Sequence, residues 1–311
     1  MERRYVLLNV FTSEPQGGNP LAIITETDGL DDASMQAIAK KLGLSETVFV
    51  LTAQNRAHTA SVRIFTPETE IPFAGHPSIG TAVYLAQDRV WSKTGEECDA
   101  LVVLEVKAGI LRIAVKPGAS APFAEYASAP FAEFDAPILP EESGETPPVD
   151  RLAAALGLAP TEIGFENFKP CRYSAGNLFT FVPIKGLDAI ARARVVEQYW
   201  AEAFNSEELS LAYLFCRDTL HHKSSFHARC FAPDHGVPED PATGSAAAAF
   251  AAVINRFDGP PEGTYNGIIE QGFEIGSPSK IHLEFEVLNR QVRVVRIGGQ
   301  AVFIREDTVA L

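Results

Sequence analysis

The stretch RIFTPETEIPFAGHPSIG, residues 63–80, decides the fold, because a degenerate copy returns as RCFAPDHGVPEDPATGSA, residues 229–246. At an offset of 166 residues, the first ten positions hold four identical and two similar pairs: Arg63/Arg229, Phe65/Phe231, Pro67/Pro233, Pro72/Pro238, Glu68/Asp234 and Ile71/Val237. After a three-residue insertion, Gly75 aligns with Gly244 and His76 with Ser245. One supersecondary unit used twice predicts two related halves, with an active site where the copies face each other.

Length and composition indicate a two-domain globular protein. The chain has 311 residues, more than one core usually holds, and is 46% hydrophobic and 21% charged. It contains no apolar run long enough to span a membrane, and the N-terminus is typical of a first strand, not a signal peptide. A net charge of −14 disfavours nucleic acid or an anionic membrane as partner but leaves a small anionic substrate possible.

The cysteines Cys98, Cys171, Cys216 and Cys230 form no CxxC pair and no disulfide frame. In a chain of this size without an export signal, they are most simply reduced thiols, so we expect a cytoplasmic protein.

Hydrophobic periodicity predicts strands and helices in both halves. Strands are expected at 5–11, 21–25, 47–52, 59–65, 178–183, 211–216, 225–231 and 281–287. Helices are expected at 31–41, capped by Gly43, and at 76–87, 188–204 and 246–256. Hairpins are expected at 101–115 and at 292–305, the latter turning at Gly298-Gly299.

Residues 118–149 are rich in Ala, Pro and Glu and are expected to be a surface loop or interdomain connection. We therefore divide the chain into residues 1–118 with a C-terminal strand at 299–311, and residues 119–298. Each half combines antiparallel strands with one buried helix that starts just after the repeat. The fold class is α+β, not a doubly wound sheet.

The two helix starts, Gly75-His76 and Gly244-Ser245, are the most informative chemical feature. A helix start presents unpaired N–H groups and a partial positive charge, and glycine allows a ligand close to the backbone. If pseudo-symmetry brings both starts together, they form a carboxylate or oxyanion site without a metal. The alternative is two ordinary capped helices.

Glu46, His76 and Asp240 are the candidates for proton transfer. Glu46 stands between a Gly-Leu-Ser turn and an apolar strand, where partial burial would raise the pKa of a carboxylate base. Each candidate also has a plain structural interpretation: Glu46 as a solvated residue at a strand start, His76 as a helix cap, and Asp240 as a turn residue before Pro241.

At this point the sequence resembles a known family. The motifs LSETVFV, FTPETEIPFAGHPSIGTA, FAPDHGVPEDPATGSAA and QGFEIGSPS, with Gly18-Asn19-Pro20, are similar to the phenazine-biosynthesis F (PhzF-like) family, in order and over almost the whole chain. The resemblance implies the diaminopimelate-epimerase-like fold: two pseudo-symmetric domains, each a curved, mostly antiparallel sheet around a central helix, with the site in the cleft between them. It also implies a homodimer and no cofactor.

The resemblance also implies roles for individual residues. Glu46 would be the acid/base that removes a proton and returns it elsewhere on a dihydro-hydroxyanthranilate-like ring. His76 and Asp240 would bind and polarise ring substituents, and Ser245 would hydrogen-bond at the helix start. The neighbours expected to bind substrate are Asn19, Gly75, Pro77, Ser78, Thr243 and Gly244.

The same fold hosts racemases that need one thiol on each face of the α-carbon. Ala74 and Thr243 occupy the matching positions here, and the cysteines are expected to lie away from both motifs. Cysteine-based racemisation is therefore disfavoured. The sequence departs from the family at Ser277, where Arg is usual, and at Ile275, where Met is usual, which leaves the role of that loop open.

Weaker signals are set aside. Lys93-Thr94-Gly95 and the SPSK of residues 277–280 resemble penicillin-recognising motifs but stand in reverse order. The histidines His221, His222, His227 and His235 lack a recognisable ligand spacing and are expected in a solvated turn, so no metal is expected. No GxGxxG or Walker-type loop is present.

The leading hypothesis is a cofactor-independent isomerase that shifts a proton on a small carboxylate-bearing, cyclic or amino-acid-like substrate. The alternatives are a PhzF-like protein that binds a metabolite or a protein with little catalysis and, less favoured, a thiol-dependent epimerase.

Overall fold

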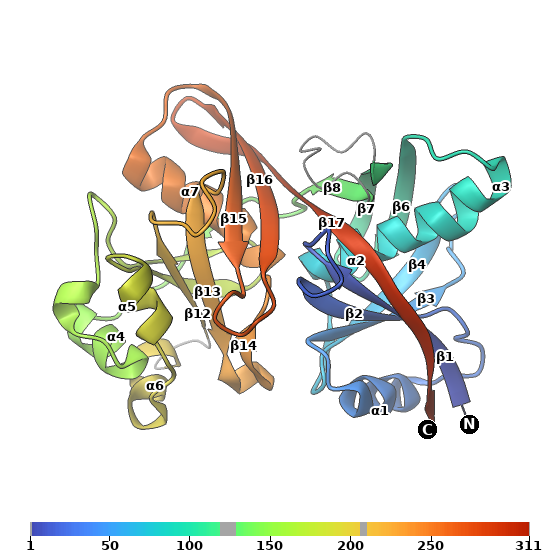
Figure 1. Ribbon diagram of the computed structural model, residues 1–311, viewed down its shortest axis with the longest axis horizontal. Helices are drawn as coiled ribbons and strands as arrows, with labels where there is room; N and C mark the ends of the chain where they lie inside the picture. The colour runs from blue at the N-terminus through green and yellow to red at the C-terminus, as the bar shows by residue number, and fades with distance from the viewer. Residues whose placement is uncertain (1, 119–128, 206–209, 311) are drawn as a thin grey trace. The chain divides into compact units, whose positions relative to one another are not determined.

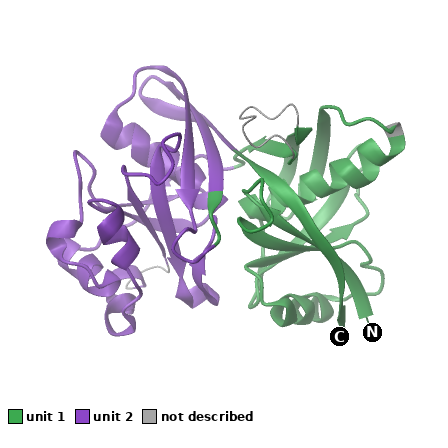
Figure 2. Ribbon diagram, viewed as in Figure 1, with its two compact units in different colours: residues 1–137, 277–279, 298–311 green, residues 138–276, 280–297 purple. Residues whose placement is uncertain are grey.

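The computed structural model describes residues 2–118, 129–205 and 210–310. The chain forms two compact units (Figure 2): unit 1 comprises residues 1–137, 277–279 and 298–311, and unit 2 comprises residues 138–276 and 280–297. The sequence placed the division after residue 118, whereas the compact units divide after Pro137. The reason is strand β8 (Phe131–Asp135), which pairs with β7 of unit 1 although its sequence is typical of a loop.

Unit 1 is a closed β-barrel (Figure 1). Its strands are β1 (Glu2–Val10), β2 (Asn19–Ile24), β3 (Glu46–Leu51), β4 (Ala60–Phe65), β5 (Glu70–Ile71), β6 (Ala100–Val106), β7 (Gly109–Lys116), β8 and part of β17 (Gln291–Ala310). Most neighbours are antiparallel, but β2 and β3 pair in parallel, as do β4 and β6. Strand β17 pairs with both β1 and β8, so it closes the barrel.

Helix α2 (Gly75–Leu85) fills this barrel. All its residues except Tyr84 are buried, and it packs on β1, β2, β3, β6, β7 and β8. It continues through a π-helical turn (Ala86–Trp91) into α3 (Ser92–Thr94). Helix α1 (Asp32–Leu42) covers β3 and β4, capped by Asp31, which accepts from Ser34 N, and by Gly43 at φ 65°.

Unit 2 repeats the plan around α7 (Gly244–Asp258). Its strands are β9 (Glu141–Glu142), β10 (Cys171–Ser174), β11 (Leu178–Pro183), β12 (Leu211–Cys216), β13 (Phe226–Ala232), β14 (Val237–Asp240), β15 (Gly263–Gln271), β16 (Ser279–Leu288) and the start of β17. Phe250 of α7 packs on the rings of Phe181, Phe215 and Phe226. Three short helices, α4 (Val149–Leu156), α5 (Leu187–Arg192) and α6 (Glu197–Phe204), pack around a second apolar cluster that includes Leu152, Trp200 and Phe204. None of the helices in the described ranges has the length and apolar character that a membrane crossing requires.

The internal repeat is real, but its insertion lies earlier than the sequence alignment placed it. Phe65 pairs with Glu70, and Phe231 pairs with Glu239. In both units, the arginine two residues before that phenylalanine donates two hydrogen bonds to the paired glutamate. Arg63 Nε and Nη2 lie 2.8 and 2.9 Å from the carboxylate oxygens of Glu70. Arg229 Nε and Nη2 lie 2.8 and 2.7 Å from those of Glu239. The three extra residues therefore lie in the turn that contains Pro233–His235.

This register corrects two predicted equivalences. Glu70 corresponds to Glu239, so Pro72 corresponds to Pro241 and not to Pro238. Ile71 corresponds to Asp240 and not to Val237, because Ile64 pairs with Ile71 while Cys230 pairs with Asp240. The equivalence of Gly75 with Gly244 is confirmed, since each is the first residue of its buried helix.

The helix predicted at 188–204 is wrong as one element. It is broken into α5 and α6 by extended backbone at Ala193. The guanidinium of Arg229 donates to the carbonyls of Ile190 and Ala193, both at 2.8 Å. A long-range side chain thus takes carbonyls that a continuous helix would use.

The predicted hairpin at 292–305 is also wrong, since β17 runs as a single strand of 20 residues. Gly298 and Gly299 do not turn the chain. A Cβ at Gly298 would lie 2.6 Å from Phe131 Cζ, and one at Gly299 would lie 2.3 Å from Phe11 Cδ1. The two glycines are required by close packing inside unit 1.

Candidate active site

Glu46 and His76 come together in unit 1. Glu46 opens β3 beside Leu21 of the parallel strand β2, and His76 is in the first turn of α2. His76 Nδ1 lies 3.2 Å from Glu46 Oε2, and the side chains are 3% and 17% exposed. The pair therefore joins a buried imidazole to a carboxylate with limited access to solvent.

His76 is neutral at physiological pH. Burial lowers its pKa to about 3, and a hydrogen bond to the Pro20 carbonyl opposes this only in part. A neutral imidazole can donate a hydrogen bond from one ring nitrogen and accept one at the other. Because the ring carries no charge, its contact with Glu46 is not a structural ion pair.

The other candidate residues of unit 1 are all buried. Asn19 starts β2, while Gly75, Pro77 and Ser78 form the first turn of α2 with His76. The Ser78 hydroxyl donates to the Ala74 carbonyl, four residues earlier, at 2.7 Å.

Asp240 and Thr243 come together in unit 2. Asp240 ends β14, and Thr243 precedes Gly244 and Ser245 at the start of α7. The Thr243 hydroxyl donates to Asp240 Oδ2 at 2.6 Å. Thr243 and Gly244 are buried, and Ser245 is half-buried. The structure therefore groups the candidates into two clusters, one in each unit.

The repeat makes the difference between the two clusters explicit. Since Thr47 pairs with Phe65 and Ala212 pairs with Phe231, Glu46 corresponds to Leu211. Asp240 corresponds to Ile71, as established above. Each unit therefore carries one of these two acids at a position where the other unit has an aliphatic side chain. Neither carboxylate is needed for the shared fold.

One prediction about the cysteines is wrong. Cys230 lies in the second copy of the repeat, and in the sheet it is paired with Asp240. Burial raises the pKa of Cys230 strongly, and the Asp240 charge adds to this, while a hydrogen bond to Thr243 opposes it. A fully buried thiol of this kind is a poor base, so its position does not revive the thiol mechanism.

The interpretation of the histidines as one solvated turn is wrong for His227. It lies in β13, is fully buried, and contacts Glu270 and Glu274, each at 2.9 Å. Burial alone would lower its pKa, but the hydrogen bonds to the two glutamates outweigh burial and raise it to about 9. Across the described ranges, no cluster of three or more His, Cys, Asp or Glu side chains could hold a metal ion.

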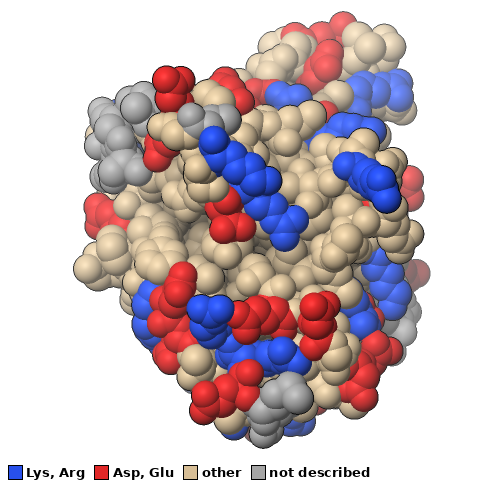
Figure 3. Space-filling view, turned by 90° about the vertical axis from the view of Figure 1, so that its right-hand side faces the viewer, with Lys and Arg blue, Asp and Glu red and all other residues tan. Residues whose placement is uncertain are grey.

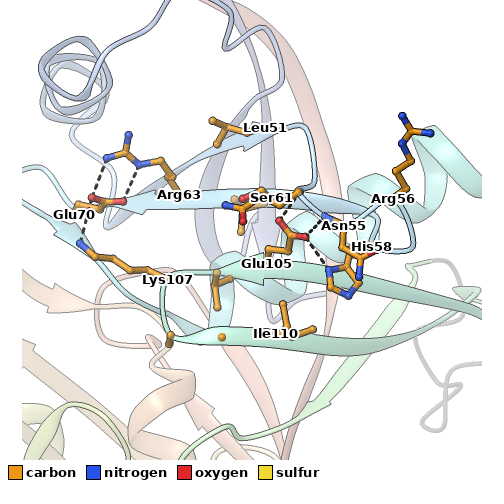
Figure 4. Close-up of a pocket in the computed structure, with 15 residues that line it drawn as sticks. Leu51, Asn55, Arg56, His58, Ser61, Arg63, Glu70, Glu105, Lys107 and Ile110 are labelled. Carbon is orange, nitrogen blue, oxygen red and sulfur yellow. Dashed lines mark hydrogen bonds and ion pairs between the residues drawn. The ribbon is translucent and has the colours of Figure 1, made fainter.

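Unit 1 also carries an open groove of about 1160 Å³ that contains none of the predicted site residues. In it, Glu70 lies between Arg63 and Lys107, and Glu105 faces His58 (Figure 4). On the face in Figure 3, acidic and basic side chains are mixed around an uncharged hollow and form no continuous basic patch. The charged pairs in the groove hold strands and a loop together.

Gln271 is a buried residue that sequence reasoning missed. Its side chain bonds to the Asp240 carbonyl and to Thr243. The partners are 31 and 28 residues away in sequence, so no local spacing could have revealed the contact. The only available signal was its position in the family-like motif QGFEIGSPS.

Comparisons with known proteins show the family to which the chain belongs. A family model described as phenazine biosynthesis-like protein matches residues 8–307. An uncharacterised isomerase of Mesorhizobium japonicum is 45% identical over 98% of this chain and 97% of its own. The trans-2,3-dihydro-3-hydroxyanthranilate isomerase of Pseudomonas aeruginosa is 33% identical over 99% of both chains.

Solved structures give the same result. The PhzF-family phenazine biosynthesis protein of Bacillus anthracis matches with a TM-score of 0.86 and 26% identity over 100% of both chains. A hydroxyproline epimerase from Agrobacterium vitis, 11% identical with a TM-score of 0.59, covers 100% of this chain and 93% of its own and shares the fold alone. The expected α+β, diaminopimelate-epimerase-like fold is confirmed. The chain is therefore an isomerase of the phenazine biosynthesis-like (PhzF) family.

Proposed function

We propose that this isomerase moves a proton between two carbons of a small carboxylate-bearing substrate, either cyclic and anthranilate-like or amino-acid-like, without a cofactor. The substrate carboxylate binds at the helix starts Gly75-His76 and Gly244-Ser245. Glu46 removes the proton from one carbon, and the C–H electron pair forms a new double bond to the adjacent carbon while the pair of the former double bond moves to the far carbon. The protonated Glu46, which can exchange its proton with solvent, then returns a proton to the far carbon, so atoms and charge balance.

The observation that carries the proposal is the buried contact between Glu46 and His76 at 3.2 Å. The neutral imidazole of His76, which hydrogen-bonds to the Pro20 carbonyl, lies beside Glu46 and can polarise a substrate oxygen. Glu46 is only 17% exposed and opens a strand whose next four residues are buried, so its carboxylate is held at the edge of the apolar core.

The comparison between the repeats supports a shared task for the two clusters. Unit 1 supplies Glu46 where unit 2 has Leu211, and unit 2 supplies Asp240 where unit 1 has Ile71. An asymmetric substrate would need such a division, with a proton carrier from one unit and a binding group from the other. A racemase acting equally on both faces of one carbon would need matching groups instead.

Solvent deuterium exchange tests the proposal directly. The substitution Glu46→Gln keeps the shape of the side chain and removes its basicity, so we expect exchange into a cyclic β-amino or β-hydroxy acid to fall at least ~100-fold. The matched control is Glu68→Gln, which changes an exposed carboxylate in the first copy of the repeat.

Unchanged exchange in the Glu46→Gln variant would show that Glu46 is not the proton carrier. If the wild-type protein exchanged no proton with any such acid yet bound one of them, the metabolite-binding alternative would replace the isomerase proposal.

A further inference from the structure

Gln271 lies at the end of β15, and its side chain is fully buried. Its Nε2 donates to the Asp240 carbonyl at 2.7 Å and to the Thr243 hydroxyl at 3.0 Å, and its Oε1 accepts from Thr243 N at 3.2 Å. One amide thus joins the end of β14 to the start of α7.

These contacts fix the direction of a further hydrogen bond. The backbone N–H of Thr243 can only donate, so the side-chain oxygen of Gln271 must face it. The side-chain nitrogen of Gln271 must then face the Asp240 carbonyl and the Thr243 hydroxyl. Because Nε2 can only donate, the Thr243 oxygen must accept from it. The single hydroxyl proton of Thr243 is then left to point at Asp240 Oδ2, 2.6 Å away.

The other repeat folds without this polar set. Ser61 pairs with Glu105 in unit 1, and His227 pairs with Glu270 in unit 2, so Gln271 corresponds to Val106. The polar residues Asp240, Thr243 and Gln271 therefore match Ile71, Ala74 and Val106. An aliphatic set at these three positions is sufficient for the barrel and its helix, so the fold does not require the polar set of unit 2.

The backbone beside Gln271 is held by an interaction that both repeats share. Glu270 accepts from the N–H groups of Leu220 and His221 and contacts His227. In unit 1, Glu105 accepts from the N–H groups of Gln54 and Asn55 and contacts His58. The conserved architecture fixes the end of β15, and the side chain of Gln271 is what unit 2 adds to it.

We propose that Gln271 is a positioning residue, which orients the Thr243 hydroxyl toward Asp240 and so holds the Asp240 carboxylate ready to accept a hydrogen bond from the substrate. The inference rests on the proposed function only in assuming that Asp240 meets the substrate. Asp240 does not need to change position for this role, because the contact with Thr243 selects one orientation of its carboxylate.

The test replaces Gln271 by the residue that unit 1 uses. In Gln271→Val, we expect kcat to fall ~10- to 100-fold with KM changing less than ~3-fold. The acidic limb of the kcat/KM profile should move to higher pH, because the Thr243 hydroxyl, whose hydrogen bond favours the charged form of the Asp240 carboxylate, is no longer held toward it. Thr243→Val should reproduce both effects, and the double variant should add little, since both changes break the same chain of contacts.

Val106→Ala is the matched control, since it changes the equivalent position in unit 1 and should leave the pH profile unchanged. Hydrogen exchange at the Thr243 amide provides a readout without substrate. We expect exchange at least ~10-fold faster in Gln271→Val while the far-UV circular dichroism spectrum stays that of the wild type.

The possible results separate this inference from the proposed function. If the Thr243 amide exchanges faster in Gln271→Val but the wild-type protein moves no proton, the contacts of Gln271 are confirmed and the isomerase proposal is refuted. An active wild type with an unchanged pH profile and an unchanged kcat in Gln271→Val would overturn the positioning role. If Gln271→Val did not fold, Gln271→Met, which keeps a similar volume without a charge or an N–H donor, must show the same shift in the pH profile.

Discussion

At the residue scale, the environment of each thiol decides whether sulfur chemistry is open to this fold. Cys171 and Cys216 are buried, and burial raises the pKa of each to about 12. Cys230 is buried beside Asp240, and only Cys98 among the four is exposed. Neither Ala74 nor Thr243 can supply a thiolate at the helix starts.

Alkylation should therefore leave the isomerase active. We expect iodoacetamide at pH 7.5 to modify Cys98 alone in the native protein, with activity reduced by less than ~20%, because the three buried thiols are inaccessible and protonated. Peptide mass spectrometry measures the sites, and the same reaction in urea, where all four thiols should react, is the control. Inactivation in step with modification of Cys230 would instead point to a thiol mechanism.

The residues that sequence reasoning found and missed differ in a physical way. Glu46, His76, Asp240 and Ser245 lie in compact motifs, where glycine, proline and helix-start signals are local. Gln271 acts through partners that the fold brings near, and its chemistry depends on which of its atoms face them. A local pattern carries no such information.

At the element scale, the sequence predicted most strands and the two central helices because their signals are local. The failures came from distant partners. Arg229 breaks the helix predicted at 188–204 by binding carbonyls 36 and 39 residues away in sequence. Gly298 and Gly299, which usually indicate a turn, serve the packing of Phe131 and Phe11 inside a continuous strand.

The packing role of Gly299 gives a stability prediction. Gly299→Ala should reduce the free energy of unfolding by ~2–3 kcal/mol, because the new Cβ would lie 2.3 Å from Phe11 Cδ1 in a fully buried ring. Phe11 cannot easily retreat, since its N–H donates to the Gln300 carbonyl at 2.7 Å. Urea unfolding measures the change.

Gly29→Ala is the control for this substitution. Gly29 has a φ of 78° and no neighbour within 4 Å of the added Cβ, so only backbone strain of ~1 kcal/mol is expected. The double variant Gly299→Ala with Phe11→Leu should recover part of the stability relative to Phe11→Leu alone. A Gly299→Ala variant as stable as wild type would show that the strand tolerates the side chain and that the packing argument is wrong.

At the scale of the whole molecule, two buried histidines tie stability to pH in opposite directions. The pKa of His76 in unit 1 is lowered to about 3 by burial. As pH falls below ~6.5, the unfolded chain binds a proton that the native state refuses, so stability declines. The pKa of His227 in unit 2 is raised to about 9. Its stabilisation is complete below ~6.5 and is lost as pH rises toward 9.

The two tryptophans of the chain allow the units to be measured separately. Trp91 is buried in unit 1 and Trp200 in unit 2. The single variant Trp200→Phe therefore keeps a fluorescent reporter in unit 1 alone, and the single variant Trp91→Phe keeps one in unit 2 alone. We expect the urea midpoint reported by Trp200 to decrease as pH rises from 6.5 to 9.5, with a loss on the order of 2 kcal/mol in unfolding free energy. The urea midpoint reported by Trp91 should decrease as pH is lowered from 6.5 to 4.5.

Substitution of each histidine provides the decisive comparison. His227→Gln should flatten the alkaline loss at Trp200, leaving only the general destabilisation that a net charge of −14 produces as the remaining cations deprotonate. His76→Gln should flatten the acid loss at Trp91 and leave the alkaline behaviour of Trp200 unchanged. If His227→Gln kept the full alkaline loss at Trp200, the buried contacts of His227 with Glu270 and Glu274 would not be the source of the pH dependence of unit 2.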